Sequence, residues 1–268
     1  MSAAPPRLLC FDVDGTLADR FVRPTVSNAA ALLRELRARY SVRLVSNATS
    51  ESHSRLFELL HGLDLIDAPR ELVTPVRTAQ RVLEARGETA GLLLCEEAAR
   101  GDFAWFREDP EGPAVVLATE AHTLRIADLQ PAFRRLQAGA KFYALQKNRY
   151  YARKSGLVTD LGPVAAFLEY ASGRRAENLG KPSPLLFESL AAEEGLALSE
   201  LVMIGDDAEF DASGAAALGL RGVLVRTGKY RPGDELRFAP PPTAVLDSVA
   251  ALPAWLESLE SASSTQNA

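Results

Sequence analysis

Two aspartates one residue apart, Asp12 and Asp14, follow the apolar run LLCF near the N-terminus and directly precede Gly15-Thr16. Side chains alternate along a strand, so both carboxylates can point the same way from the strand's end. They would repel each other unless a cation lay between them. Mg2+ favours one or two carboxylates together with water and phosphate oxygens. The spacing therefore predicts an active site that binds Mg2+ and a phosphorylated substrate.

Three further short motifs fall at the ends of predicted strands or the starts of predicted helices, where open α/β sheets bind their ligands. They are Ser46-Asn47, Lys181 within a Gly-Lys-Pro sequence, and the pair Asp206-Asp207 with Asp211 after it. Each motif alone is ambiguous, because a Gly-Lys-Pro is usually a solvated turn and a double Asp is more often a helix cap than a metal ligand. Their occurrence together, in this order, indicates one site.

The elements that must position these residues alternate between strand-like and helical patterns. This alternation is typical of an α/β fold with a mainly parallel sheet flanked by helices. In the outer parts of the chain it predicts strands at 8–13, 42–46, 201–204 and 222–225, and helices at 27–39, 51–61, 185–194, 211–218 and 249–259, followed by a polar tail at 261–268.

A different stretch begins near Val76, has its own strand-like runs at 92–95, 115–118 and 142–145, and ends near Asn178. The economical arrangement is a core domain built from residues 1–75 and 177–268, with a second α/β domain of residues 76–176 inserted into it.

Composition narrows the class of protein. Hydrophobic residues make up 47% of the 268 residues and charged residues 24%, as in ordinary globular proteins. The net charge is −5, with no long basic run, so nucleic acid is not an expected partner. No apolar stretch is long enough for a membrane span, and the first residues lack a signal-peptide pattern. We expect a cytoplasmic protein.

The four motifs, taken in order, resemble those of the haloacid dehalogenase (HAD) superfamily of phosphohydrolases. This resemblance implies a Rossmann-like core and the roles of individual residues. Asp12 would be the nucleophile, and Asp14 would protonate the leaving group and later activate water. A carboxylate already ionised at neutral pH needs no base, and it forms an aspartyl-phosphate that water then hydrolyses.

The same resemblance assigns the remaining site residues. Ser46 and Asn47 would hold the phosphoryl oxygens, and Lys181 would neutralise charge on the nucleophile and the phosphate. Mg2+ would be bound by Asp12, Asp206 and the backbone carbonyl of Asp14. In the family, Asp207 and Asp211 would orient ligated water or Lys181 without binding the metal themselves.

The place of the insertion, between the second and third motifs, resembles the type C2 cap of the NagD-like HAD proteins (subfamily IIA). The stretches Lys147–Tyr151 and Val225–Pro232 resemble the branch that includes the phospholysine phosphohistidine inorganic pyrophosphate phosphatases. This implies an Mg2+-dependent phosphatase that acts on small phosphorylated metabolites or pyrophosphate, and a possible homodimer. The sequence does not identify the substrate or the cap residues that select it.

Other functions stay open. A catalytically silent HAD-fold binding or scaffold protein would be favoured by loss of the nucleophile, the lysine or the metal-binding aspartate, and all of these are present. Phosphotransferase or mutase activity is compatible with the same motifs. Carbon–halogen cleavage needs neither Asp14 nor the Asp206-Asp207 pair, so their presence argues against it. The Thr-Gly-Lys sequence at 227–229 could approach the site, but a structural turn explains it equally well.

Overall fold

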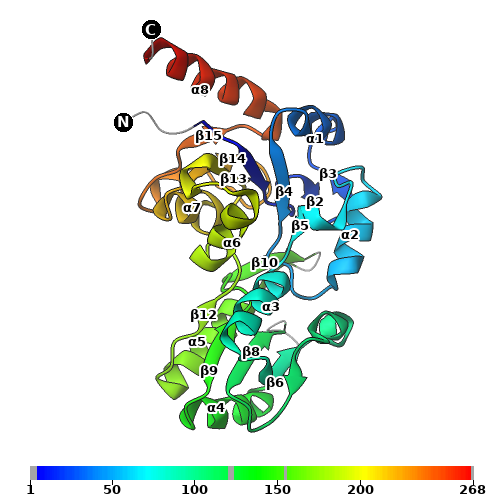
Figure 1. Cartoon of the computed structure of the whole chain (residues 1–268), viewed down its shortest axis with the longest axis vertical. Helices are drawn as coiled ribbons and strands as arrows, with labels where there is room; N and C mark the ends of the chain where they lie inside the picture. Colours follow the sequence, from blue (N-terminus) through cyan, green and yellow to red (C-terminus); the bar gives the residue numbers. More distant parts are fainter. Residues whose placement is uncertain (1–4, 120–123, 154–155, 267–268) are drawn as a thin grey trace. The chain divides into compact units, whose positions relative to one another are not determined.

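A computed structural model of the chain describes residues 5–119, 124–153 and 156–266. It divides into two compact units, one made of Met1–Ser46, Leu56–Val73 and Phe187–Ala268, the other of Asn47–Arg55 and Thr74–Leu186. Each unit contains one large parallel sheet (Figure 1). The expectation of an α/β fold with parallel sheets flanked by helices is confirmed.

The sheet of the first unit has six strands, all parallel, in the order β15-β14-β13-β1-β4-β5. Its central strands are continuous apolar runs, as expected of strands covered on both faces. All residues of β1 and β13 are buried. The strands are β1 Leu8–Phe11, β4 Ser41–Val45, β5 Leu72–Val73, β13 Leu201–Gly205, β14 Arg221–Val225 and β15 Ala244–Leu246.

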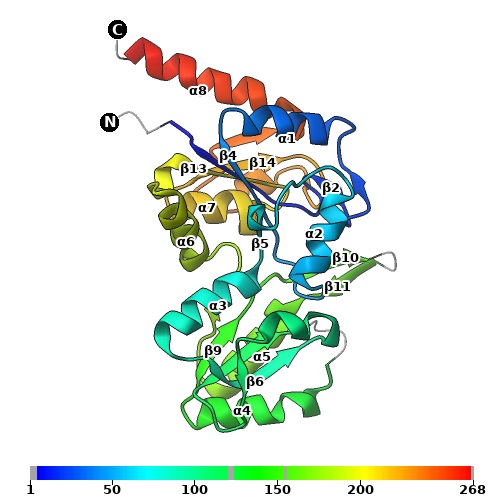
Figure 2. The same cartoon turned by 45° about the vertical axis from the view of Figure 1, so that its right-hand side comes forward.

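Helices cover both faces of this sheet. Figures 1 and 2 show α1 and α8 on one side and α6 and α7 on the other. Helix α1 (Ala29–Arg37) presents Leu32, Leu33 and Leu36 to the core, the three-to-four residue spacing of an amphipathic helix. The other helices are α2 His53–His61, α6 Pro184–Glu194, α7 Ser213–Ala217 and α8 Leu252–Gln266.

The predicted polar tail was wrong for most of its length, because α8 continues to Gln266. Residues 261–266 contain no Gly or Pro. The hydroxyl of Ser261 donates to the carbonyl of Glu257 one turn earlier. A polar composition alone does not end a helix.

The sheet of the second unit has five parallel strands in the order β12-β9-β8-β6-β7. Alternate residues of its strands enter two different apolar clusters. Val115 and Leu117 of β8 pack with α4 and α5, whereas Val116 packs with α3 on the opposite face. The elements are α3 Pro75–Arg86, β6 Ala90–Cys95, β7 Arg107–Glu108, β8 Ala114–Ala118, α4 Gln130–Gln137, β9 Lys141–Ala144, α5 Leu161–Ser172 and β12 Glu177–Asn178.

Two antiparallel hairpins complete the strands. One pairs β2 (Ala18–Asp19) with β3 (Arg23–Pro24), and the other pairs β10 (Tyr150–Arg153) with β11 (Gly156–Thr159). Among the described helices, none is both long and apolar enough to cross a membrane.

Candidate active site

The strand order of the first unit brings three predicted site residues, Asp12, Ser46 and Asp206, to one edge of the sheet. Strands β13, β1 and β4 are neighbours and run parallel, so their carboxyl ends meet at one edge of the sheet. Asp206 follows β13 directly, Asp12 follows β1 and Ser46 follows β4. The backbone N–H of Asp12 donates to the carbonyl of Ile204 (2.8 Å), which extends the pairing of β1 and β13 to the aspartate itself. The edge predicted for the site is where these residues lie.

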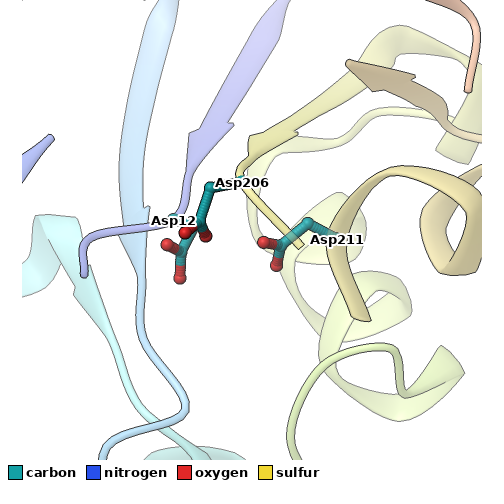
Figure 3. A group of neighbouring side chains, drawn as sticks. All are labelled: Asp12, Asp206 and Asp211. Atoms are coloured by element: carbon teal, nitrogen blue, oxygen red, sulfur yellow. The ribbon is translucent and has the colours of Figure 1, made fainter. Parts of the chain in front are cut away.

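Three buried carboxylates converge at this edge. Asp12, Asp206 and Asp211 each offer an oxygen within 4.8 Å of the others. Figure 3 shows Asp12 and Asp206 side by side at the ends of β1 and β13, with Asp211 pointing toward them from the helical turn Ala208–Ala212. Asp206 and Asp211 are each 1% exposed and Asp12 is 8% exposed. Buried carboxylates at this spacing need positive charge nearby, because like charges in a dry site strongly oppose ionisation.

The two oxygens of Asp206 have different surroundings. Oδ2 accepts a hydrogen bond from the backbone N–H of Lys229 (2.6 Å). Oδ1 is buried and has no hydrogen-bond partner among the described residues. Burial, and next the charge of Asp12, hold the pKa of Asp206 well above its ordinary value. A buried carboxylate oxygen without a donor, in a residue that clusters with two further carboxylates, is what a cation site requires, so these residues fit a bound divalent ion.

Two glycines allow the backbone to pass close to Asp206. Gly15 and Gly228 have φ values of +91° and +54°, a region that favours glycine. A Cβ at either position would collide with the carboxylate of Asp206. The hydroxyl of Thr227 donates to the carbonyl of Gly15 (2.6 Å), which joins the loop after β14 to the loop after β1.

Asp14 lies on the loop after β1, and its side chain is not a member of the acidic cluster. Its Oδ1 accepts from the backbone N–H of Arg20 (2.6 Å). Arg20 and the next residue, Phe21, both have positive φ in the tight turn between β2 and β3. Burial raises the pKa of Asp14, the Arg20 N–H opposes this, and the charge of Asp12 adds to the rise, so the net shift is upward. A carboxyl group with a raised pKa suits a proton donor.

Asp207 and Asp211 do different things in the loop after β13. Asp207 caps the helical turn, since its Oδ1 accepts from the backbone N–H groups of Glu209 (3.0 Å) and Phe210 (3.1 Å). Asp211 accepts from the backbone N–H of Asp207 (3.2 Å) and also lies in the acidic cluster. The family resemblance implied that Asp211 orients ligated water or Lys181. In the structure one of its carboxylate oxygens lies within 4.8 Å of an oxygen of Asp12 and of Asp206.

Lys229 is the residue that sequence reasoning did not place. Its Nζ lies 3.5 Å from Oδ2 of Asp207. Burial lowers the pKa of Lys229, but the carboxylates of Asp207, Asp206 and Asp12 raise it more, and the net shift is upward. The signal was present in the sequence: Thr227-Gly228-Lys229 follows the strand next to β13, so it arrives at the same sheet edge as Asp206.

Asn47 and Lys181 form a second group, in the second unit. The backbone N–H of Lys181 donates to Oδ1 of Asn47 (2.8 Å), and Nδ2 of Asn47 donates to the Lys181 carbonyl (3.1 Å) and to Asn148 (3.1 Å). Lys181 is 2% exposed and Asn47 9%. The Asn47 side chain therefore fixes the backbone of the lysine, a contact that the sequence did not predict.

Comparison with known proteins identifies the family. A model of haloacid dehalogenase-like hydrolases matches residues 9–104, and a HAD-hydrolase-like model matches residues 178–252. The human haloacid dehalogenase-like hydrolase domain-containing protein 2 is 38% identical over 239 residues, which cover 88% of this chain and 90% of that protein. The chain belongs to the haloacid dehalogenase-like hydrolase family. The resemblance drawn from the four motifs is confirmed.

Other HAD proteins extend the comparison. Human phospholysine phosphohistidine inorganic pyrophosphate phosphatase is 34% identical over 235 residues, 85% of this chain and 86% of that protein. The glycerol phosphate phosphatase Rv1692 of Mycobacterium tuberculosis, solved in complex with magnesium, superposes with a TM-score of 0.79 at 25% identity, covering 93% of this chain and 77% of that one. NagD of E. coli K-12 shares the fold, with a TM-score of 0.79 over 92% of this chain and 98% of NagD at 20% identity.

Proposed function

We propose that this HAD hydrolase is an Mg2+-dependent phosphatase acting on small phosphorylated metabolites or pyrophosphate. The observation that carries the proposal is the buried cluster of Asp12, Asp206 and Asp211, in which Oδ1 of Asp206 has no donor among the described residues. The phosphatases among its relatives support the same reaction class.

In the proposed reaction, an oxygen of Asp12 attacks phosphorus and the bond from phosphorus to the leaving oxygen breaks. Asp14 gives its proton to that oxygen, so the product leaves as a neutral alcohol or protonated phosphate. Asp14, now ionised, takes a proton from water, which attacks the aspartyl-phosphate and restores Asp12 with release of phosphate. The raised pKa of Asp14 supports this role, because the group must be protonated at the start of the cycle.

The metal site is proposed to consist of Asp12, Asp206 and the backbone carbonyl of Asp14, with Asp211 beside them. Bound Mg2+ would offset the charge of the carboxylates and of the transferring phosphoryl group. Ser46, Asn47 and Lys181 are proposed to bind the phosphoryl oxygens. Residues 76–176 are proposed to be the cap that selects the rest of the substrate. The hydrogen bonds between the Asn47 side chain and the Lys181 backbone would hold the lysine in place for the reaction.

The first experiment measures phosphate release from a panel that includes p-nitrophenyl phosphate, pyrophosphate, sugar phosphates, nucleotides and phosphohistidine, with Mg2+ and then with EDTA. We expect release that requires the metal. Asp12→Asn should lower kcat by about 10³-fold or more, because an amide cannot form the aspartyl-phosphate. The change is nearly isosteric, so circular dichroism should show the fold intact.

Two results would contradict the proposal. Full activity of a folded Asp12→Asn variant would remove Asp12 as the nucleophile. No release from any compound by a wild-type protein that binds Mg2+ would favour a HAD-fold binding protein instead.

A further inference from the structure

The loop after β14 brings a lysine to the acidic cluster by two independent contacts. The backbone N–H of Lys229 donates to Oδ2 of Asp206 (2.6 Å), and its Nζ lies 3.5 Å from Oδ2 of Asp207. The side chain of Lys229 is only 28% exposed. The loop is held in place by Gly228, whose backbone packs against Gly15, and by the hydrogen bond from Thr227 to Gly15.

The carboxylates around this ammonium carry more negative charge than it can balance alone. Asp12, Asp206 and Asp211 form the cluster. Asp207 adds a fourth carboxylate, which pairs with Lys229, and its backbone N–H donates to Asp211. In a partly buried site the attraction between an ammonium and a carboxylate is several times stronger than in water. Lys229 therefore supplies fixed positive charge to a group of residues that has an excess of negative charge.

We propose that Lys229 is a tethered counter-ion of this cluster: its ammonium stabilises the metal-free protein and lowers the affinity of the cluster for a divalent cation. The second half of this inference rests on the proposed metal site, and the first half does not. A divalent ion that entered the cluster would meet the repulsion of an ammonium whose own backbone N–H is bonded to Asp206.

The backbone and side-chain contacts of Lys229 can be separated experimentally. Lys229→Met keeps the backbone N–H that bonds Asp206 and most of the side-chain volume, and removes the ammonium group. Lys229→Arg keeps the charge in a different shape. Lys141→Met makes the same chemical change at an exposed lysine of the second unit and serves as the matched control.

The test measures thermal unfolding in EDTA and Mg2+ binding by titration calorimetry for these three variants and the wild type. We expect Lys229→Met to lower the Tm in EDTA by about 2–4 °C, and to lower the Kd for Mg2+ by about tenfold or more. Lys229→Arg should have a Tm and a Kd for Mg2+ closer to those of the wild type. Lys141→Met should change neither the Tm nor the Kd.

A Tm in EDTA that is the same for Lys229→Met and Lys141→Met would overturn the inference. So would an unchanged or weaker Mg2+ affinity of Lys229→Met when the wild type binds the ion. If the wild type binds no Mg2+, the proposed metal site fails, and the unfolding experiment in EDTA decides by itself whether Lys229 stabilises the cluster.

Discussion

At the scale of single residues, the carboxylate of Asp206 has two separate tasks. Oδ2 is fixed by the N–H of Lys229, so the group cannot rotate freely. Oδ1 is buried and has no donor among the described residues. A free carboxylate in water would satisfy both oxygens. The folded chain gives up the second hydrogen bond at this site, at a cost in stability that a bound cation would offset.

The dependence of stability on pH should reveal what the burial of the Asp206 carboxylate costs the folded protein. The pKa of Asp206 is raised on folding, above all by burial, so the folded protein binds its proton more tightly than the unfolded chain. Below pH 3.8, the ordinary pKa of an aspartate, the carboxyl group is protonated in both states and its burial costs no stability through ionisation. This loss of stability grows as the pH rises from 3.8 toward the pKa of Asp206 in the folded protein. In EDTA at pH 7–8, Asp206→Asn should stabilise the protein by about 1 kcal/mol, or about 2–4 °C in Tm.

Melting curves of the wild type and of Asp206→Asn should be compared from pH 4 to pH 8 in EDTA. Asp247→Asn, the same change at an exposed aspartate, serves as the control. The advantage of Asp206→Asn should shrink as the pH falls. A variant that is less stable than wild type at every pH would mean that Asp206 is stabilising without a metal.

At the scale of elements, the loops after β1 and β14 determine how closely the backbone approaches the carboxylate of Asp206. Gly15 and Gly228 pass so close to Asp206 that no side chain fits. The strands fix where each loop begins, and the glycines fix how near the two loops approach. The shape of the cluster therefore depends on loop conformations as much as on the sheet.

Gly228→Ala tests this dependence. It should destabilise the protein by about 1–3 kcal/mol more than Gly195→Ala does, because its Cβ collides with Asp206 in addition to the strain of a positive φ. Gly195 is a matched control, since its φ is +65° and no atom lies within 4 Å of the place that a Cβ would take. Equal losses of unfolding free energy in urea for the two variants would show that the loops move aside at little cost.

The Asn47 clamp on Lys181 can be tested in the same way within the second unit. Asn47→Ala leaves the backbone N–H of Lys181 without its acceptor, so we expect a loss of about 1–3 kcal/mol and a lower kcat. Asn148→Ala removes only one contact of Asn47 and should cost less. If the two variants behaved alike in urea unfolding and in phosphate release, the clamp would not be what positions the lysine.

At the scale of the whole molecule, the acidic cluster exists only in the folded chain, because Asp12 and Asp206 lie far apart in the sequence. A divalent ion that binds the cluster must therefore stabilise the fold. At a Mg2+ concentration 100 times its Kd, the gain is about 2.7 kcal/mol, which should raise the Tm by several degrees. Asp206→Asn should abolish most of this rise, and an equal rise in that variant would place the ion elsewhere.

Sequence reasoning could locate the strands and the edge of the sheet, because β1, β4, β13 and β14 are short, mainly apolar segments that are each followed by a polar motif. It could not settle the loops. The place of Asp211 depends on how the turn after β13 coils, and that of Lys229 on two glycines with positive φ. These backbone conformations leave no periodic pattern in the sequence. The sequence therefore did not predict how closely the Asp211 carboxylate approaches Asp12 and Asp206, and it left Lys229 open between a place near the site and a structural turn.

The strand order has a consequence for how the chain matures on the ribosome. Strand β1 is synthesised before the whole second unit, and its neighbour β13 only after that unit. The five strands of the second unit are encoded within one continuous stretch, so that sheet can assemble first. Until then the apolar β1 has no partner on one side, and we expect nascent chains stalled before β13 to expose it and to bind chaperones.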